Sequence, residues 1–109
     1  MKLTNEVAVY VPSTLGESDA DQALISRIVD QALTELSTVN GGATAQSGVG
    51  AWLSNDGKLV KESVTIVSSN CETITVQTLR TLASLRKLVR ESMAQEAVTV
   101  RVNGVLYIR

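Results

Sequence analysis

The sequence predicts an α+β protein of the ferredoxin-like split βαβ type, an antiparallel sheet with two helices on one face and an extra C-terminal hairpin strand. Three observations lead to this fold class. Two segments carry apolar residues at helical spacing, and five other segments carry the alternation or the branched residues of strands. Asp56-Gly57 and Asn103-Gly104 mark two hairpin turns. We expect residues 1–109 to form one domain.

The elements follow from local patterns. We predict strands at residues 6–11, 43–53, 58–67, 97–102 and 105–109, and helices at 20–39 and 75–94. Pro12 ends the first strand because proline cannot donate to the ladder, and residues 13–19 are polar, as in a loop. Ser18 is the predicted N-cap of the first helix, and Gly41 and Gly42 end it. The side of the second helix that faces the core is predicted to carry Leu82, Leu85, Val89 and Met93, with Leu88 at its margin.

The stretch GGATAQSGVGAW, residues 41–52, has two open interpretations. A phosphate-binding loop needs Lys and then Ser or Thr on the way into a helix, whereas Ala51 and Trp52 lead into a strand. A dinucleotide fingerprint lacks its third glycine, because Leu53 stands there. We favour a helix stop and a bulged strand whose open backbone borders a pocket. A ligand contact stays open, since the stretch carries the donors Thr44, Gln46 and Ser47.

The residue types that are missing exclude several kinds of site. Histidine is absent and Cys71 is the single cysteine, so the chain has no zinc-ligand set and no Ser-His-Asp or Cys-His nucleophile. We therefore predict a protein that is not an enzyme and that uses no cofactor and no metal. Cys71 is expected to be a small buried hydrophobe.

The net charge and the aromatic content limit the kinds of partner that the chain is expected to bind. A net charge of −1 and only three aromatic residues, with no Phe, argue against polymeric nucleic acid, which calls for a basic face or several stacking platforms. The sequence shows no signal peptide and no apolar run as long as a membrane helix. These features predict a cytoplasmic protein with no membrane partner.

Arginines are the candidates for anion binding. A basic arc on the second helix lies opposite Leu85 and is either a solvated outer face or an anion site that two subunits share. Arg27 stands beside the apolar stripe of the first helix, as a salt-bridge partner of Asp30 or as a second phosphate contact. For each arginine taken alone we favour the structural role. The arc consists of Arg80, Arg86, Lys87 and Arg90.

Four further polar or aromatic positions are candidates. Trp52, the one large aromatic, is predicted to be a core residue, with stacking on a base as the alternative. Asn70 begins the loop before the second helix. Gln95 and Glu96 end that helix, where an acidic residue is unfavourable toward the helix dipole, so Glu96 is a candidate contact.

Several segments together resemble a known family. They are YVPST at 10–14, the stretch at 41–52, LVKESVTIV at 59–67, QEAV at 95–98 and NGVLYI at 103–108. They resemble the small phage proteins of the first-described Thoeris anti-defence type. The resemblance implies a homo-oligomer, built from dimers and up to a hexamer, in the cytoplasm of the infected bacterium. Such a protein sequesters cyclic ADP-ribose isomers made by TIR proteins without cleaving them, and some members also hold cyclic oligonucleotides.

The chain departs from that family at two places. Val39-Asn40 stand where an aromatic is expected before the glycine pair, and Tyr107-Ile108-Arg109 stand where a more apolar end is expected. Both departures leave the base-stacking partner open. The resemblance and the residues together give the predicted ligand-binding set, which is Arg27, Thr44, Trp52, Asn70, Arg86, Arg90 and Gln95.

Two other functions remain as alternatives. One is a small enzyme on the same fold that uses Glu62 or Glu96 for acid–base chemistry. The other is a structural or protein-binding module, such as an inhibitor of a host protein. Product formed from a substrate would favour the first, and a co-purifying partner protein would favour the second.

Overall fold

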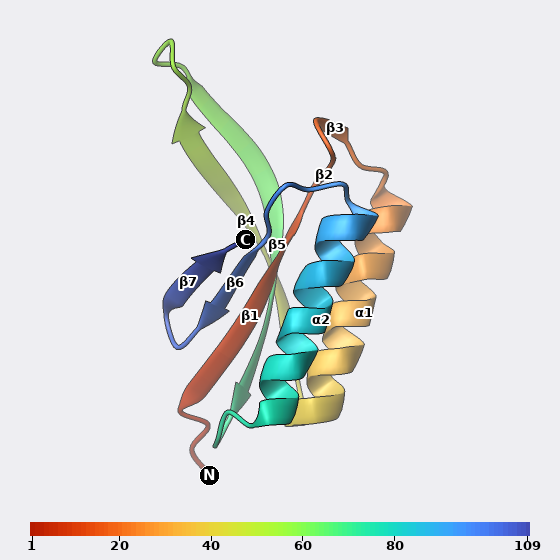
Figure 1. Cartoon of the computed structure of the whole chain (residues 1–109), viewed down its shortest axis with the longest axis vertical. Helices are drawn as coiled ribbons and strands as arrows, with labels where there is room; N and C mark the ends of the chain where they lie inside the picture. Colours follow the sequence, from red (N-terminus) through yellow and green to blue (C-terminus); the bar gives the residue numbers. More distant parts are fainter.

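The computed structural model describes residues 1–109 and confirms the predicted fold class, with two helices over one face of a five-stranded antiparallel sheet (Figure 1). The sheet has the order β4-β5-β1-β6-β7, so β1 is central and β7 is the extra hairpin strand. The strands of this sheet are β1 (Asn5–Pro12), β4 (Thr44–Leu53), β5 (Leu59–Cys71), β6 (Thr99–Val102) and β7 (Val105–Ile108). The helices are α1 (Gln22–Asn40) and α2 (Val76–Ser92).

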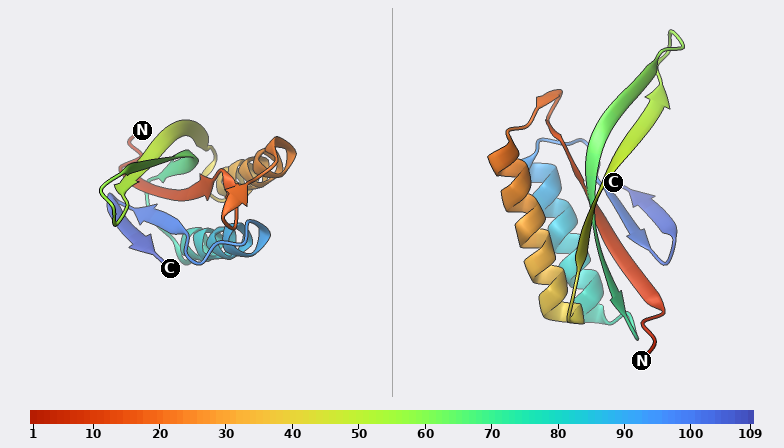
Figure 2. Two further views of the ribbon diagram at one scale, coloured as in Figure 1. Left: turned by 90° about the horizontal axis from the view of Figure 1, so that it is seen from above. Right: turned by 180° about the vertical axis from the view of Figure 1, so that it is seen from behind.

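The two faces of the sheet differ in what covers them. Successive strand residues point to opposite faces, so Val7, Val9 and Val11 of β1 enter the core under the helices. Tyr10 and Pro12 point to the other side, which no helix covers (Figure 2). We call that side the open face.

The core consists of apolar side chains from both helices and from β1, β5 and β6. The inward side of α2 is as predicted, because Leu82, Leu85, Val89 and Met93 are all buried. The core cluster comprises Val7, Val9, Val11, Ile25, Ile28, Ala32, Leu36, Val67, Leu82, Leu85, Val89, Met93, Val98 and Val100.

A cluster of hydrogen-bonded polar side chains connects both helices to β5. Asn40 at the end of α1 donates from Nδ2 to Ser69 Oγ at 3.1 Å, and its Oδ1 accepts from Thr78 Oγ1 at 3.3 Å. Ser69 and Thr78 are buried, so these bonds satisfy hydroxyls that would otherwise destabilise the fold. Gly41 then ends α1 with φ of 91°, as predicted for a helix stop.

The start of α1 differs from the prediction. Asp21, and not Ser18, is the N-cap, and its carboxylate accepts from the amides of Ala23 and Leu24. Ser18 is unavailable because β3 (Ser18–Asp19) pairs with β2 (Thr14–Leu15) inside the segment predicted as a loop. At α2 the N-cap is Thr75, which forms a capping box with Thr78.

Pairing between strands corrects two further predictions. β5 continues to Cys71 because β1 pairs with it up to Asn5↔Cys71, so Asn70 lies in a strand and not in a loop. The ladder between β4 and β5 is continuous from Thr44↔Ser68 to Leu53↔Leu59, so the predicted bulge is absent. The β4–β5 hairpin extends beyond the ends of the helices, which leaves its tip uncovered on both faces (Figure 2).

The turn between β6 and β7 is as predicted. Asn103 and Gly104 have φ of 49° and 81°, the pair of positive values that a type I′ turn needs. Neither helix combines the length and the apolar character that crossing a membrane would require.

Candidate functional site

The open face carries a pocket of about 350 Å³, within the range of small-molecule sites. β4 and the residues before β6 line it together, although β5 and β1 lie between them in the sheet. The curl of the sheet brings them together (Figure 2). We call this the open-face pocket, and it is lined by Tyr10, Pro12, Gly48, Val49, Gly50, Trp52, Glu62, Val64, Ile66, Gln95, Ala97, Val98 and Thr99.

Two glycines of β4 leave part of the pocket wall without side chains. Gly48 lies opposite Val64 and Gly50 lies opposite Glu62, so the bare backbone of β4 borders the pocket. Neither glycine has a positive φ, and a Cβ at Gly48 would meet Val64 Cγ1 at 3.5 Å. Glycine is therefore not needed here for the backbone conformation, and its effect is to keep space free. The glycine stretch borders a pocket, as we favoured, and it forms no phosphate loop.

Trp52 and Glu62 give the pocket an exposed indole ring and its one charged group. Trp52 is 52% exposed, so the prediction of a core residue is wrong, because no layer covers the projecting hairpin. Glu62 is half-buried and is the one lining side chain that is charged at neutral pH. Thr14 Oγ1 donates to Glu62 Oε1 at 3.4 Å and helps to orient the carboxylate.

Gln95 closes the pocket on the side of β2. Its Nε2 donates to the carbonyl oxygens of Met93 at 2.8 Å and Thr14 at 3.1 Å, with Thr14 Oγ1 also at 3.3 Å. The amide nitrogen is thus fully used, and the amide oxygen accepts no hydrogen bond from the chain. A hydrogen-bonded chain therefore runs from Gln95 through Thr14 to Glu62.

A second depression extends the open-face pocket toward the β2–β3 hairpin. It shares Trp52, Glu62 and Gln95 with the pocket. Two further carboxylates, Glu17 and Asp19, line it against the single cation Lys61. The approach to the pocket is therefore net negative and favours a cationic ligand.

Beside the pocket lies an ion pair that the sequence analysis missed. Arg101 donates from Nε to Glu6 Oε1 at 2.9 Å and from Nη1 to Tyr10 Oη at 2.8 Å, and its Nη2 lies 2.7 Å from Glu6 Oε1. The guanidinium carbon lies 5.7 Å from the centroid of the Tyr10 ring. The hydrogen bond to Glu6 raises the pKa of Arg101 above its ordinary value. Alternation places Glu6 and Tyr10 on one face of β1, but only the pairing of β1 with β6 brings Arg101 to them.

The structure does not bring the predicted ligand-binding set together. Trp52 and Gln95 line the open-face pocket, whereas Thr44 and Asn70 line another hollow beside the end of α1. Arg86 is half-buried in a groove between α2 and the β6–β7 hairpin. The remaining predicted arginines, Arg27 and Arg90, are exposed on the helices, and Arg27 forms no salt bridge with Asp30.

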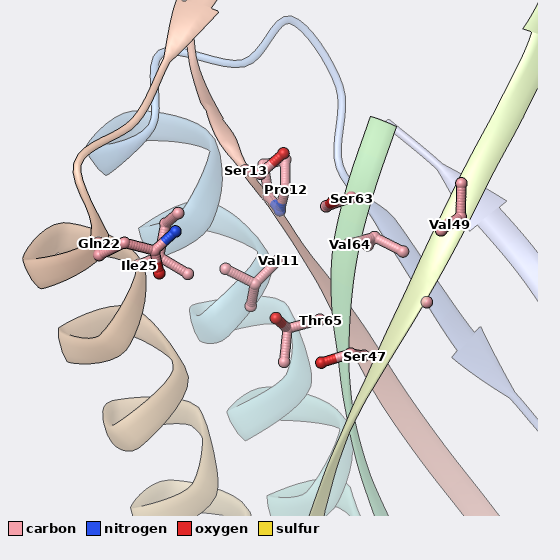
Figure 3. Close-up of a pocket in the computed structure, with 11 residues that line it drawn as sticks. Val11, Pro12, Ser13, Gln22, Ile25, Ser47, Val49, Ser63, Val64 and Thr65 are labelled. Atoms are coloured by element: carbon pink, nitrogen blue, oxygen red, sulfur yellow. The ribbon is translucent and has the colours of Figure 1, made fainter. Parts of the chain in front are cut away.

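A hollow of about 360 Å³ lies on the opposite, helix-bearing side of the β4–β5 hairpin (Figure 3). Hydroxyl groups of Ser13, Ser47, Ser63 and Thr65 surround it, next to the start of α1. It carries no charged side chain and offers nothing to neutralise an ionic ligand. The open-face pocket is the better equipped of the two.

Cys71 is free and buried, as expected for a structural thiol. Nowhere in the chain do three or more carboxylate or thiol side chains come close enough together to hold a metal ion.

The fold and the pocket define a small α+β protein whose open face carries a pocket with two aromatic residues, one carboxylate and a net negative approach. No protein-family model matches the sequence, and a search of curated proteins finds no match. Among solved structures the chain is similar to a phage SAM lyase in complex with S-methyl-5'-thioadenosine, with a TM-score of 0.68 and 18% identity over 100% of this chain and 91% of that one. It is also similar to a phage SAM lyase in the apo state, with a TM-score of 0.61 and 17% identity over 96% of this chain and 87% of that one. At these identities the likeness shows the fold.

This likeness contradicts two predictions, that the chain is no enzyme and that it sequesters a cyclic nucleotide without cleaving it. The structures that share its fold along nearly the whole chain are of an enzyme. The absence of an imidazole, a metal site and an activated thiol does not by itself exclude catalysis, because a substrate that carries its own leaving group needs none of them. The resemblance to the Thoeris anti-defence proteins is not tested by these structures and stays a prediction.

Proposed function

We propose that the chain is a lyase that binds S-adenosylmethionine (SAM) in the open-face pocket and releases S-methyl-5'-thioadenosine. One observation carries the proposal: an exposed tryptophan and a single carboxylate line the same pocket, on a fold shared along the whole chain with a phage SAM lyase. The fold likeness supplies the candidate substrate, and the pocket supplies groups that suit it.

The adenosine part matches the Trp52 end of the pocket. The indole ring of Trp52 offers a face on which adenine can stack. The free amide oxygen of Gln95 can accept from the adenine amino group, and the carboxylate of Glu62 can accept from the ribose hydroxyls. Gly48 and Gly50 let the ligand approach the backbone closely.

The charge of SAM also matches the pocket. Its sulfonium and its ammonium are cations, and they approach a site rimmed by Glu17, Asp19 and Glu62. S-methyl-5'-thioadenosine has lost both cations. The proposed product is therefore held less strongly than the substrate, which favours its release.

The identity of the product fixes which bond breaks. S-methyl-5'-thioadenosine keeps sulfur, methyl and adenosine, so the broken bond joins sulfur to the γ-carbon of the aminobutyrate part. Sulfur takes the electron pair and leaves as a neutral thioether, while a carboxylate oxygen of the same substrate bonds to the γ-carbon. The second product is a five-membered lactone, and no water or co-reactant enters. Attack within one molecule can lower the activation barrier by about 7–11 kcal/mol relative to the same reaction between separate molecules, when the reacting atoms are correctly oriented.

The competing route is elimination, in which a base removes a proton from the β-carbon. Glu62 is the one carboxylate in the pocket, and a carboxylate is a weak base toward an unactivated C–H bond. Ring closure places no such demand on the chain, whose residues need only hold the substrate folded. We therefore favour lactone formation.

The test is to incubate the purified chain with SAM and to measure both products by chromatography and mass spectrometry. Trp52→Ala and Glu62→Gln should each lower kcat/KM about 10- to 100-fold, because each removes a ligand contact. Thr44→Ala is the matched control, since it lies on β4 but outside the pocket. If the wild-type chain forms no more S-methyl-5'-thioadenosine than a heat-inactivated sample, the proposal is wrong.

We also propose that the chain acts as a homo-oligomer in the cytoplasm of a phage-infected bacterium, where SAM is available. Large apolar side chains are more than half exposed at both edges of the sheet. A second copy that covers them would bury this surface, and light scattering coupled to gel filtration would show the mass. A monomer at all concentrations would contradict it. These side chains are Val49, Leu53 and Leu59 on the β4–β5 hairpin and Val105 and Ile108 on β7.

A further inference from the structure

Arg101 lies beside the open-face pocket without lining it. It stands on β6 opposite Ala8 of β1, and the small alanine leaves room for the guanidinium to reach the residues two positions away on both sides. On one side it meets Glu6 through Nε and Nη2, and on the other it donates from Nη1 to Tyr10 Oη at 2.8 Å. Arg101 thus connects the lining residue Tyr10 to Glu6, which lies outside the pocket.

This contact decides how the phenol of Tyr10 is used. A guanidinium has only donors, so Tyr10 Oη must accept from Arg101. The hydroxyl keeps one proton of its own, and no acceptor in the chain takes it. Because Arg101 occupies one side of the hydroxyl, Tyr10 can donate this proton to a ligand in the pocket.

We propose that Arg101 is a positioning residue that holds Tyr10 as a hydrogen-bond donor for the carboxylate of the substrate. This inference rests on the proposed function and assigns the end of the pocket that receives the amino-acid arm. Glu62 repels a carboxylate, so the carboxylate belongs at the end away from it. Tyr10 is at that end, because it lies opposite Ile66, four residues along β5 from Glu62, or about 13 Å.

The arrangement requires arginine at this position. The planar fork of Arg101 bonds Glu6 and Tyr10 at the same time, whereas a lysine ammonium on a flexible stem would hold one of them. Glu6 neutralises the guanidinium and fixes its plane. Tyr10 is then oriented before the substrate arrives, and the cost of ordering it on binding is reduced.

The test compares two ligands that differ in the amino-acid arm. S-adenosylhomocysteine carries the aminobutyrate arm, but its sulfur is a neutral thioether and not a sulfonium, so the proposed reaction does not cleave it. S-methyl-5'-thioadenosine lacks that arm. In calorimetric titrations, Tyr10→Phe and Arg101→Met should weaken S-adenosylhomocysteine about 10- to 100-fold, the loss expected for a hydrogen bond to a charged group. Neither variant should change the affinity for S-methyl-5'-thioadenosine. Lys58→Met, which breaks the exposed ion pair with Asp56 at the hairpin tip, should change neither affinity.

The outcomes separate the two proposals. Equal weakening of both ligands, together with a lowered melting temperature, would mean that Arg101 only supports the fold and would overturn the inference. Unchanged affinity of Tyr10→Phe for S-adenosylhomocysteine would overturn it as well, even if the wild-type chain cleaves SAM. Arg101→Lys should recover part of the affinity at most. A wild-type chain that binds neither ligand and forms no product would remove the proposed function and this inference together.

Discussion

Alanine in place of Gly48 should narrow the open-face pocket and leave the fold intact. The backbone at Gly48 has no positive φ, and an added Cβ would lie 3.5 Å from Val64 Cγ1, an ordinary van der Waals contact. Alanine also has fewer unfolded conformations than glycine. The free energy of unfolding should therefore stay the same or rise by up to about 1 kcal/mol.

The effect on binding should be much larger than the effect on stability. The new methyl group stands on the pocket wall along which we place the adenosine. One methylene too many in a fitted pocket costs about 1–3 kcal/mol, or about 10- to 200-fold in affinity. We expect Gly48→Ala to weaken S-methyl-5'-thioadenosine within that range, and the bulkier Gly48→Val to weaken it further.

Calorimetric titration and urea unfolding of the same samples measure both quantities. Gly42→Ala is the matched control, because Gly42 has no positive φ, no atom within 4 Å of an added Cβ and no place in the open-face pocket. Gly42→Ala should bind like the wild type. Should Gly48→Ala also bind like the wild type while remaining folded, the ligand does not lie against β4 and our assignment of the pocket is wrong.

Three further predictions follow from single features of the chain. Trp52 is the only tryptophan and is 52% exposed, so its emission should shift to shorter wavelength when S-methyl-5'-thioadenosine binds; an unchanged spectrum at calorimetric saturation would place the ligand elsewhere. Histidine is absent, so kcat/KM for SAM should be flat between about pH 5.5 and 7.5, and a steep change in that range would reveal a titrating group that our mechanism omits. Gly104→Ala should lower the free energy of unfolding by about 1 kcal/mol because φ is 81° there, whereas the same change at Gly42, which has no positive φ, should cost little in urea unfolding.

The fold class was predictable because its signals are local. The stripe of α2, the Asn103-Gly104 turn and the stop at Gly41 depend on residues close in sequence, and all three were confirmed. The errors concern the ends of elements, which the pairing of strands decides. β5 runs to Cys71 because Asn5 pairs with it, and Asp21 caps α1 because Ser18 is part of a short strand pair.

The pocket was harder to predict for a similar reason. Gly48, Gly50 and Trp52 were recognised as unusual, but the reason for their spacing is visible only when the sheet curls and brings residues 95–99 over them. Trp52 was placed in the core because it is the one large aromatic, and a sequence does not say that a hairpin projects past its helices. No local sequence pattern indicated the role of Arg101, because its partners lie more than ninety positions away in the chain.

The missing histidine argued against catalysis only if the protein had to supply an acid, a base or a nucleophile. In the proposed reaction a carboxylate anion and a sulfonium cation become an uncharged ester and an uncharged thioether, while the ammonium of the amino-acid part keeps its charge. Charge therefore disappears as the transition state forms, and an apolar pocket destabilises the charged ground state more than the transition state. The walls between the two ends of the pocket are apolar, with Val64, Ile66 and Val98 among them. A chain that fixes the adenosine at Trp52 and the carboxylate at Tyr10, with apolar side chains along the wall between them, can accelerate this reaction without histidine.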